Sequence, residues 1–253
     1  MIDEIVSDVR KGVERRRQKV PVGNLPARRS RIRSLSEAIR DCQHVPIIAE
    51  IKPMSPSEGI LRQNLDVVAL AREYEAGGAI AISVLTEPKY FGGNLENLVE
   101  VKDATNLPVL RKDFIVDEYQ IHESAAYGAD SILLISSCVR NKLSDFLSMA
   151  NDLDLETIVE CRSARDIRLA VDAGAKMIGV NNRDLHTLRV DLGVTKQLAK
   201  YVPSNTILIS ESGVRTAKDI RFLIEAGANA VLIGTTLMRS KKPEEKLREF
   251  VQA

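Results

Sequence analysis

The sequence predicts an α/β protein, a single (β/α)8 barrel with an N-terminal helical extension. From residue 45 onward, short apolar segments alternate with segments long enough for one helix each. A glycine recurs just before every second apolar segment, as repeated βα units would require. An open doubly wound sheet is the alternative, but the GxGxxG that usually follows its first strand is missing. With a length of 253 residues, which suits one barrel domain, these observations favour a closed TIM barrel.

The N-terminal extension, residues 1–44, is predicted to be helical and to pack as a lid or cap on the barrel of residues 45–253, in one domain overall. Ile2, Ile5 and Val9 stand at helical spacing, so an amphipathic helix is expected over about the first 20 residues.

Two further signals lie in this extension. The basic run of residues 15–17 is expected to be a solvated helix end, since cations suit a helix C-terminus. After a link that contains Pro and Gly, Ser34 and Glu37 have the spacing of a capping box. A second helix is therefore predicted near residues 35–41.

The barrel strands follow in order along the chain. They are predicted at residues 45–51, 79–85, 109–111, 131–135, 156–160, 177–180, 206–210 and 230–233. The recurring glycines precede the second, fourth, sixth and eighth strands, where a residue that ends a helix adopts the left-handed conformation. These glycines are Gly77, Gly78, Gly128, Gly174 and Gly227.

The first strand runs directly into a loop rich in Pro, Ser and Gly, between Pro46 and Gly59. Because strand side chains alternate, Ile48, Glu50 and Lys52 share one face. A carboxylate and an ammonium at the end of a buried strand are costly unless they pair or meet a ligand. Either a structural ion pair or a site would account for this pair alone.

Composition excludes several classes of function. The net charge of +1 gives no general attraction to nucleic acid or to an anionic membrane. No apolar run is long enough to span a membrane, and no secretory signal is recognisable. Three widely spaced cysteines without a CxxC motif indicate reduced thiols of a cytoplasmic protein, and the isolated histidines indicate no metal site.

Polar residues gather at the carboxyl ends of the predicted strands. In a βα barrel these ends converge, so ionisable groups on five different elements predict one shared active site. The residues concerned are Glu50 and Lys52 on the first strand, Lys112 on the third, Glu160 on the fifth, Asn181, Asn182 and Arg183 after the sixth, Glu211 and Ser212 after the seventh, and Thr235 after the eighth.

The last two loops indicate the ligand. Ser212-Gly213 and Gly234-Thr235 lack bulky side chains where a backbone must approach a ligand closely. Short Gly-bearing loops after the seventh and eighth strands commonly bind phosphate in such barrels, so a phosphate ester substrate is expected. A lysine beside glutamates can act as a general acid, and a desolvated glutamate as a general base. Such a pair suits ring closure or dehydration at a carbonyl carbon.

Six motifs in order resemble one known family, indole-3-glycerol phosphate synthase, over essentially the whole chain. They are Glu50-Ile51-Lys52-Pro53-Met54-Ser55-Pro56-Ser57, Val109-Leu110-Arg111-Lys112-Asp113-Phe114, Ile158-Val159-Glu160, Gly179-Val180-Asn181-Asn182-Arg183-Asp184-Leu185, Ser210-Glu211-Ser212-Gly213 and Ile233-Gly234-Thr235-Thr236-Leu237-Met238. The family converts 1-(2-carboxyphenylamino)-1-deoxyribulose 5-phosphate to indole-3-glycerol phosphate, carbon dioxide and water in tryptophan biosynthesis. The resemblance implies a (β/α)8 barrel that uses no cofactor and no metal.

The resemblance also implies roles for individual residues. Lys112 would be the general acid of ring closure, and Glu160 the general base of dehydration. Lys52 would hold the anthranilate carboxylate, with its share in the later acid step left open. Glu50 would keep the lysines charged and oriented. The remaining expected site residues are Asn181, Glu211 and Ser212 in the pocket, Ser55 beside the carboxylate, Phe91 and Phe114 against the ring, Arg183 and Leu185 on the sixth loop, and Gly213, Gly234 and Thr235 at the phosphate.

Two departures from the common family pattern and two rival functions remain. Pro53-Met54 replaces residues that are often more polar, and Thr235-Thr236 stands where a serine is frequent. Phosphoribosylanthranilate isomerase would be expected to end its first strand with a cysteine, where this chain has Glu50 and Lys52. A catalytically silent binding barrel would have no reason to keep a lysine and two glutamates facing one cavity. The phosphate-binding loops and the near-neutral net charge give the expected partner. It is a small phosphate ester, with no nucleic acid, membrane or obligate protein partner.

Overall fold

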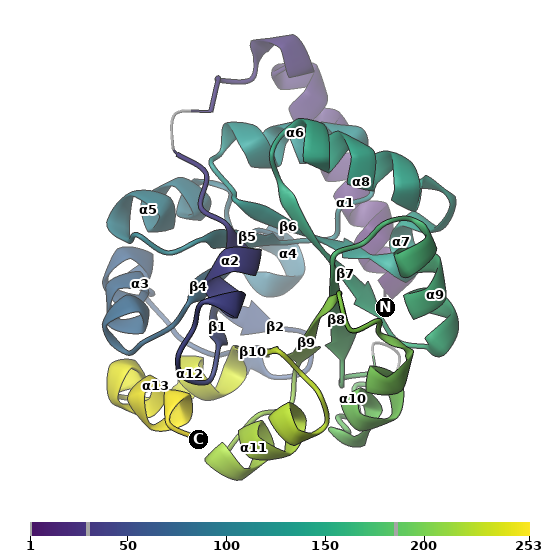
Figure 1. The fold of residues 1–253 in the computed structure, drawn as a ribbon. Coiled ribbons are helices and arrows are strands. Elements are labelled where there is room, and N and C mark those ends of the chain that lie inside the picture. Colours follow the sequence, from purple (N-terminus) through teal and green to yellow (C-terminus); the bar gives the residue numbers. More distant parts are fainter. Residues whose placement is uncertain (1, 29–30, 185–186) are drawn as a thin grey trace.

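Eight parallel strands close into a barrel in the computed structural model, which describes residues 2–28, 31–184 and 187–253 (Figure 1). The strands are β1 (Ile47–Ile51), β4 (Ala81–Leu85), β5 (Val109–Lys112), β6 (Ser131–Ile135), β7 (Glu156–Cys161), β8 (Met177–Asn181), β9 (Ile207–Glu211) and β10 (Ala230–Ile233). Each pairs in parallel with the next along the chain, and β10 pairs with β1 to close the ring. The predicted barrel is confirmed, with strand bounds that shift by at most two residues.

Helices surround the barrel on its outer side, as Figure 1 shows. The longer ones are α3 (Val67–Ala76), α5 (Glu96–Ala104), α6 (Glu118–Ala126), α8 (Leu143–Asp152), α9 (Ala164–Asp172), α10 (Gly193–Leu198), α11 (Ala217–Glu225) and α13 (Pro243–Val251). Short helices α4 (Pro88–Phe91), α7 (Ser136–Val139) and α12 (Thr235–Arg239) follow three of the strands directly. Several of the longer helices begin at a residue whose side chain accepts a backbone N–H, which satisfies an otherwise unpaired donor. These residues are Asp66, Asp117, Ser163 and Thr216.

In the glycine repeat, one glycine before each of β4, β6, β8 and β10 has the predicted left-handed conformation, whereas Gly77 is right-handed, with φ of −76°. Gly78, Gly128, Gly174 and Gly227 have φ of 94°, 82°, 92° and 105°. This left-handed region costs glycine nothing and strains any residue with a Cβ. The repeat therefore marks the turn from helix to strand in every second βα unit.

The alternation of strand side chains divides the apolar residues into two buried clusters. Ile47, Ala49 and Ile51 face outward and pack under the surrounding helices. Ile48 faces inward, where it packs with interior residues of the other strands. Glu50 is on the same side as Ile48, one step nearer the carboxyl end, so the barrel directs its carboxylate into the interior.

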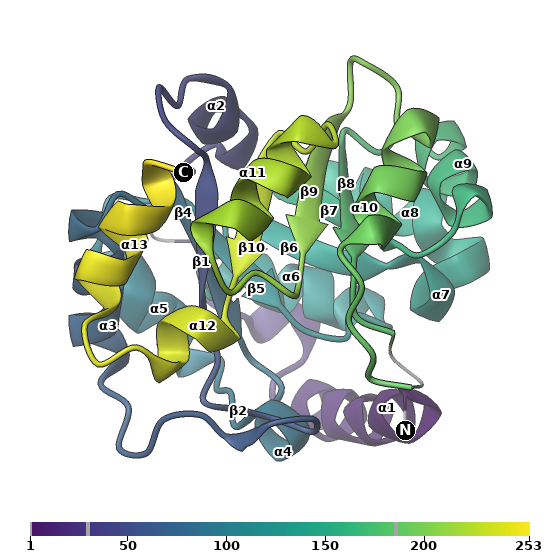
Figure 2. The ribbon, with the colours of Figure 1, turned by 90° about the horizontal axis from the view of Figure 1, so that it is seen from below.

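The N-terminal extension covers both ends of the barrel (Figure 2). Helix α1 (Ile2–Lys19) lies at the carboxyl ends of the strands, beside α4, whereas α2 (Leu35–Arg40) lies at the opposite end. Ile5, Val9 and Val13 bury the predicted apolar face of α1. Each end therefore has its own apolar cover.

Polar contacts fix both helices of the extension. The Arg16 guanidinium binds the carboxylate of Glu123 on α6 at 2.6 Å, and Arg17 binds Asp117. The basic run ends α1 as predicted, and Arg17 is 41% exposed, but Arg16 is tied to a buried carboxylate and is not simply solvated. At α2, Ser34 accepts from the N–H of Glu37 as predicted, and the Glu156 carboxylate accepts from further backbone N–H groups.

The loop after β1 contains a short antiparallel hairpin. Its strands are β2 (Met54–Ser55) and β3 (Gly59–Ile60), joined by residues 56–58. The sequence predicted an irregular loop here, because Pro, Ser and Gly dominate its composition. The hairpin lies at the carboxyl end of the barrel, near α4 and α1 (Figure 2).

Candidate active site

A cavity of about 650 Å³ opens at the carboxyl ends of the strands. All the site residues implied by the family resemblance line it, except Leu185, which lies outside the described residues. Asn182, which the sequence also placed at the strand ends, does not line the cavity; it is buried and bonds to Ser210 and Thr195. The lining residues that the sequence predicted are Glu50, Lys52, Ser55, Phe91, Lys112, Phe114, Glu160, Asn181, Arg183, Glu211, Ser212, Gly213, Gly234 and Thr235. The barrel topology thus brings together residues that are spread over 186 positions, from Glu50 to Thr235.

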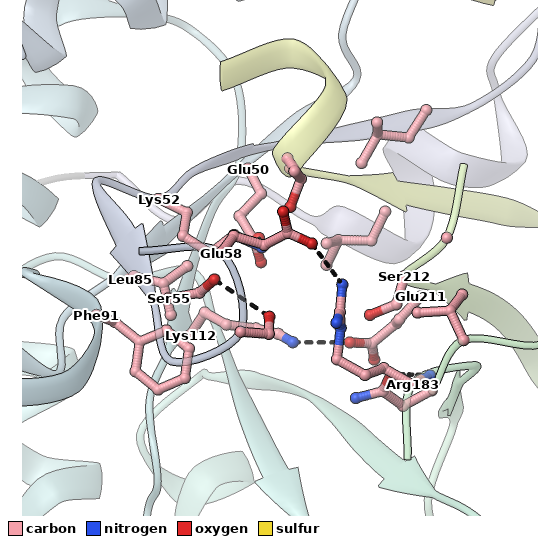
Figure 3. A pocket seen from close by; sticks show the side chains of 18 of the residues that line it. Glu50, Lys52, Ser55, Glu58, Leu85, Phe91, Lys112, Arg183, Glu211 and Ser212 are labelled. Atoms are coloured by element: carbon pink, nitrogen blue, oxygen red, sulfur yellow. Dashed lines mark hydrogen bonds and ion pairs between the residues drawn. The ribbon is translucent and has the colours of Figure 1, made fainter. Parts of the chain in front are cut away.

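Lys112 lies at the centre of the charged groups, at the end of β5. Its Nζ is 2.7 Å from Glu211 Oε2 (Figure 3). The same atom is 3.8 Å from Glu160 Oε2. Burial works against the charged form, but Glu211, Glu160 and Glu50 outweigh it and raise the pKa of Lys112 above its ordinary value. The side chain is therefore an ammonium that holds three protons next to a cavity.

Glu50 and Lys52 form a second pair on β1 and just beyond it, with Oε1 and Nζ 2.7 Å apart. Burial tends to raise the pKa of Glu50, but the charges of Lys52 and Lys112 outweigh it and hold this pKa below its ordinary value. Gly234 makes room for the pair, since a Cβ there would lie 2.2 Å from Glu50 Oε1. The glycine of the last loop thus supports a carboxylate on the first strand.

Glu211 is the carboxylate with an unsatisfied oxygen. Its Oε2 accepts from Lys112, while its buried Oε1 has no hydrogen-bond partner within the described residues. Burial raises the pKa of Glu211 to about 7, although Lys112 opposes this, and the nearby Glu160 adds to the rise. Gly179 leaves space for the same oxygen, since a Cβ there would be 2.1 Å away. Near neutral pH this carboxyl group can hold or release a proton.

Asn181 connects Glu160 to the sixth loop. Its Nδ2 donates to Glu160 Oε1 at 3.2 Å, and its Oδ1 accepts from the N–H of Arg183 at 2.9 Å. The amide therefore fixes the orientation of one carboxylate and the start of the loop that bears Arg183. The carboxylate of Glu160 lies within reach of both Lys112 and the cavity.

The turn after β9 has an unusual backbone. Ser212 and Gly213 have φ of 68° and 100°, and the Asn182 amide donates to the Ser212 carbonyl at 3.1 Å. A Cβ at Gly213 would lie 2.6 Å from Val190 and 2.7 Å from Leu192. Glycine is thus required at this position for both conformation and space. The turn brings bare backbone to the cavity beside Gly234 and Thr235.

Four further cationic side chains line the cavity, besides Lys52 and Lys112. They are Arg183, Arg215, Arg239 and Lys246. The sequence singled out only Arg183, because the others follow the strand ends by several residues. Glu58, also missed, binds two of these arginines. Such cations and short Gly-bearing turns suit an anionic group.

The other end of the cavity is apolar and aromatic. The rings of Phe91 and Phe114 have centroids 6.0 Å apart and planes inclined by 41°. Ile2 and Ile5 of α1 add to this wall, which the sequence did not predict. A flat ring and an anionic group can therefore bind at opposite ends, with the Lys112 cluster between them.

Metal-ligating clusters and membrane-spanning helices are both absent from the part of the chain that the structure describes. Within residues 2–28, 31–184 and 187–253, no group of three His, Cys, Asp or Glu side chains has the arrangement of a metal site. In the same residues, no helix is both long enough and apolar enough to cross a membrane. Cys42, Cys138 and Cys161 are free thiols.

The fold and the cavity define a class: a (β/α)8-barrel enzyme with acid–base groups at the carboxyl ends of its strands. Comparison with known proteins gives the family. Residues 2–250 match the family described as indole-3-glycerol phosphate synthase, and the chain belongs to that family. A protein of that name from Thermoanaerobacter sp. (strain X514) is 42% identical over 253 residues, which cover 100% of this chain and 97% of the relative. The one from Methanocaldococcus jannaschii is 43% identical, over 99% of this chain and 98% of its own.

Solved structures support the fold only. A thiamine phosphate pyrophosphorylase from Pyrococcus furiosus superposes with a TM-score of 0.62 at 14% identity, over 81% of this chain and 93% of its own. The family match, and not this superposition, gives the function. The protein is a lyase of the carboxy-lyase class that acts in tryptophan biosynthesis, as its family does. This excludes phosphoribosylanthranilate isomerase, the rival with the same expected fold.

Proposed function

We propose that the Lys112–Glu160–Glu211 cluster performs the proton transfers of indole-3-glycerol phosphate synthesis. The observation that carries the proposal is the position of Lys112, an ammonium 2.7 Å from Glu211 and 3.8 Å from Glu160 beside the cavity. A general acid needs a proton to give and a pKa that keeps it, and both follow from these glutamates. The substrate is 1-(2-carboxyphenylamino)-1-deoxyribulose 5-phosphate.

Ring closure is the first step. The ring carbon that bears the carboxylate attacks the ketone carbon of the sugar, a C–C bond forms, and the ketone oxygen takes a proton from Lys112. The attacking ring loses aromaticity and carries an iminium, which accepts the electron pair of the breaking C–C bond when the carboxylate leaves as carbon dioxide. Lys52, paired with Glu50 on β1, holds that carboxylate before it leaves, and Ser55 is beside it.

Dehydration follows. Glu160 removes a proton from the new ring as the hydroxyl group leaves, and an ammonium gives that hydroxyl the proton it needs to depart as water. Lys112 and Lys52 are the two candidates for this second donor. Asn181 supports the role of Glu160, because its amide donates to that carboxylate and orients it.

The remaining residues bind the ends of the substrate. Phe91 and Phe114 pack on the anthranilate ring at the apolar end. The backbone at Gly213, Gly234 and Thr235 takes the phosphate, with Ser212 and Arg183 close by. We place Leu185 on the same sixth loop by its sequence position alone.

The test is the appearance of indole fluorescence when the purified protein meets the substrate without added metal or nucleotide. We expect turnover by the wild type and losses of at least about 10²-fold in kcat for Lys112→Ala and Glu160→Gln, the range of general acid–base contributions. The exposed Lys200→Ala variant is the matched control and should keep wild-type rates. Full activity in Lys112→Ala would contradict the proposed role of Lys112 as general acid.

We further propose that the enzyme works in the cytoplasm, without an obligate protein partner, on a small phosphate ester. Three free thiols support a reducing compartment. All proposed binding and proton-transfer groups come from one chain, which supports function without a partner subunit.

A further inference from the structure

Glu58, in the turn of the β2–β3 hairpin, binds two arginines from two other elements. Its Oε2 is 2.6 Å from Nη2 of Arg239, at the end of α12. Its Oε1 is 3.7 Å from Nη2 of Arg183, on the loop after β8. Figure 3 shows the carboxylate reaching across the cavity toward Arg183, on the opposite side from Lys52.

The hairpin holds Glu58 in this place. The Pro53 carbonyl accepts from the N–H groups of Leu61 and Arg62, which closes the base of the hairpin. The guanidinium of Arg62 donates to the Ser240 carbonyl at 2.8 Å, which fastens the hairpin to the end of α12. The position of Glu58 between the arginines is therefore fixed by the backbone around it as well as by its own ion pairs.

Charge sets Glu58 apart from the other acids of the cavity. Glu50 pairs with Lys52, and Glu160 and Glu211 approach Lys112. Asp113 pairs with Arg111, behind the cavity wall. Among the lining residues that the structure describes, Glu58 is the acid that forms ion pairs with Arg183 and Arg239. A carboxylate of the protein thus occupies the cationic end where the proposed function places the phosphate.

We propose that Glu58 determines specificity as an internal anion, which competes with the substrate phosphate for Arg183 and Arg239. This inference rests on the proposed function for the identity of the anion. A phosphate dianion gains more from two guanidinium groups than a carboxylate with one charge does, and Arg binds phosphate with parallel N–H donors. A dianion therefore displaces Glu58, while a ligand with one negative charge gains too little to do so.

The expected magnitude is modest because the pairs are partly exposed. Glu58 and Arg183 are about three-quarters buried, whereas Arg239 is 56% exposed. Partly exposed ion pairs are worth up to about 1 kcal/mol, which corresponds to at most roughly fivefold in binding. Removal of the Glu58 charge should tighten anion binding by that factor.

Glu58→Gln keeps the size of the side chain and removes its charge. At pH 8 and constant ionic strength, the variant should bind inorganic phosphate, measured by calorimetry, roughly two- to fivefold more tightly than the wild type. The KM for substrate should be lower in the variant as well, because the substrate phosphate would bind more tightly. The control Glu245→Gln removes an exposed carboxylate that pairs with Lys242 and does not line the cavity, and should change neither value.

A double-mutant cycle with Arg239→Gln separates two explanations. In one, Glu58 competes with phosphate for Arg239; in the other, its negative charge only repels the bound anion. If Glu58 competes for Arg239, the gain from Glu58→Gln shrinks when Arg239 is already neutral. Unchanged or weaker phosphate binding in Glu58→Gln, or no phosphate binding by either protein, would overturn the inference. Circular dichroism of each variant shows that a loss is not one of folding.

The outcomes also separate this inference from the proposed function. If the wild type turns over substrate but Glu58→Gln leaves phosphate affinity unchanged, only the role of Glu58 fails. If the wild type gives no turnover while Glu58→Gln tightens phosphate binding, the proton-transfer roles fail and the competing anion remains.

Discussion

Arg111 and Glu123 form a buried ion pair, with Nη2 and Oε2 3.0 Å apart. Arg111 is fully buried and also binds Asp113 at 2.8 Å, while Glu123 binds Arg16 of α1 at 2.6 Å. Two positive and two negative charges therefore join helix α1 to strand β5, which bears Lys112. Balanced charge and many hydrogen bonds make such a burial tolerable.

Removal of one member of this network should be costly. Glu123→Ala leaves two guanidinium groups without a shared partner, and we expect it to lower the free energy of unfolding by about 3–5 kcal/mol. Urea denaturation measures this change. As a control, Glu244→Ala removes an exposed partner of Arg248 and should cost less than about 1 kcal/mol. Equal effects from the two variants would mean that the network does not stabilise the fold.

The raised pKa of Glu211 predicts a pH dependence of stability. The folded pKa is about 7, against an ordinary value of 4.5. A raised pKa means that the folded state holds the proton more tightly. Its stabilising contribution is therefore complete below about pH 4.5 and is lost as the pH rises through 7. Between pH 5 and 8, the wild type should lose on the order of 2 kcal/mol relative to Glu211→Gln.

Urea titrations of both proteins at several pH values measure that difference. The comparison cancels the titration of other groups, because both proteins carry them. A constant difference across this range would show that Glu211 keeps an ordinary pKa.

Gly234→Ala should disturb the site by steric overlap alone. It adds no backbone strain of the left-handed kind, because Gly234 has a negative φ of −114°. The new methyl group would lie 2.2 Å from Glu50 Oε1 and 3.1 Å from Lys52 Nζ, so this pair must move. We expect kcat/KM to fall by about 10²-fold, since displacements of about 1 Å can cost that much. Gly23→Ala is the control, as a Cβ there meets no atom within 4 Å. Steady-state kinetics of the two variants provide the comparison.

Helix α1 should contribute to substrate binding as well as to stability. Ile5 and Val13 are each 2% exposed on the same face of α1, but only Ile5 lines the cavity. Ile5→Ala should lower the free energy of unfolding by about 2–4 kcal/mol, and Val13→Ala should lower it as well, because each leaves a void. Only Ile5→Ala should also raise KM, by roughly fivefold or more. Assays run well below the unfolding temperature distinguish the two effects.

The sequence predicted those features of the site that depend on local periodicity. Glu50, Lys112, Glu160 and Glu211 each lie at or near the carboxyl end of a largely apolar segment, and a parallel barrel must bring such ends together. The family resemblance supplied the individual roles, which remain proposals. The outward direction of Arg111, next to Lys112, follows from the alternation of strand side chains.

The missed features depend on partners that are distant in the sequence. Arg16 finds its carboxylate 107 positions away, and a basic run has the same pattern whether it is paired or solvated. Glu58 finds Arg239 181 positions away, through a hairpin that its composition does not indicate. Ile2 and Ile5 were predicted to be buried, but their amphipathic pattern does not specify which end of the barrel they cover.

The division of the N-terminal extension between the two ends of the barrel has a consequence for the order of folding. The contacts that hold α1 join residues about 107 positions apart, and those that hold α2 join residues 120 to 122 positions apart. During synthesis these helices leave the ribosome well before α6 and β7 are made. Until then, α1 and α2 have no partner surface to pack against. Long-range contacts of this kind slow folding, and a helix of six residues such as α2 has little stability alone. The segment made first is therefore expected to dock among the last.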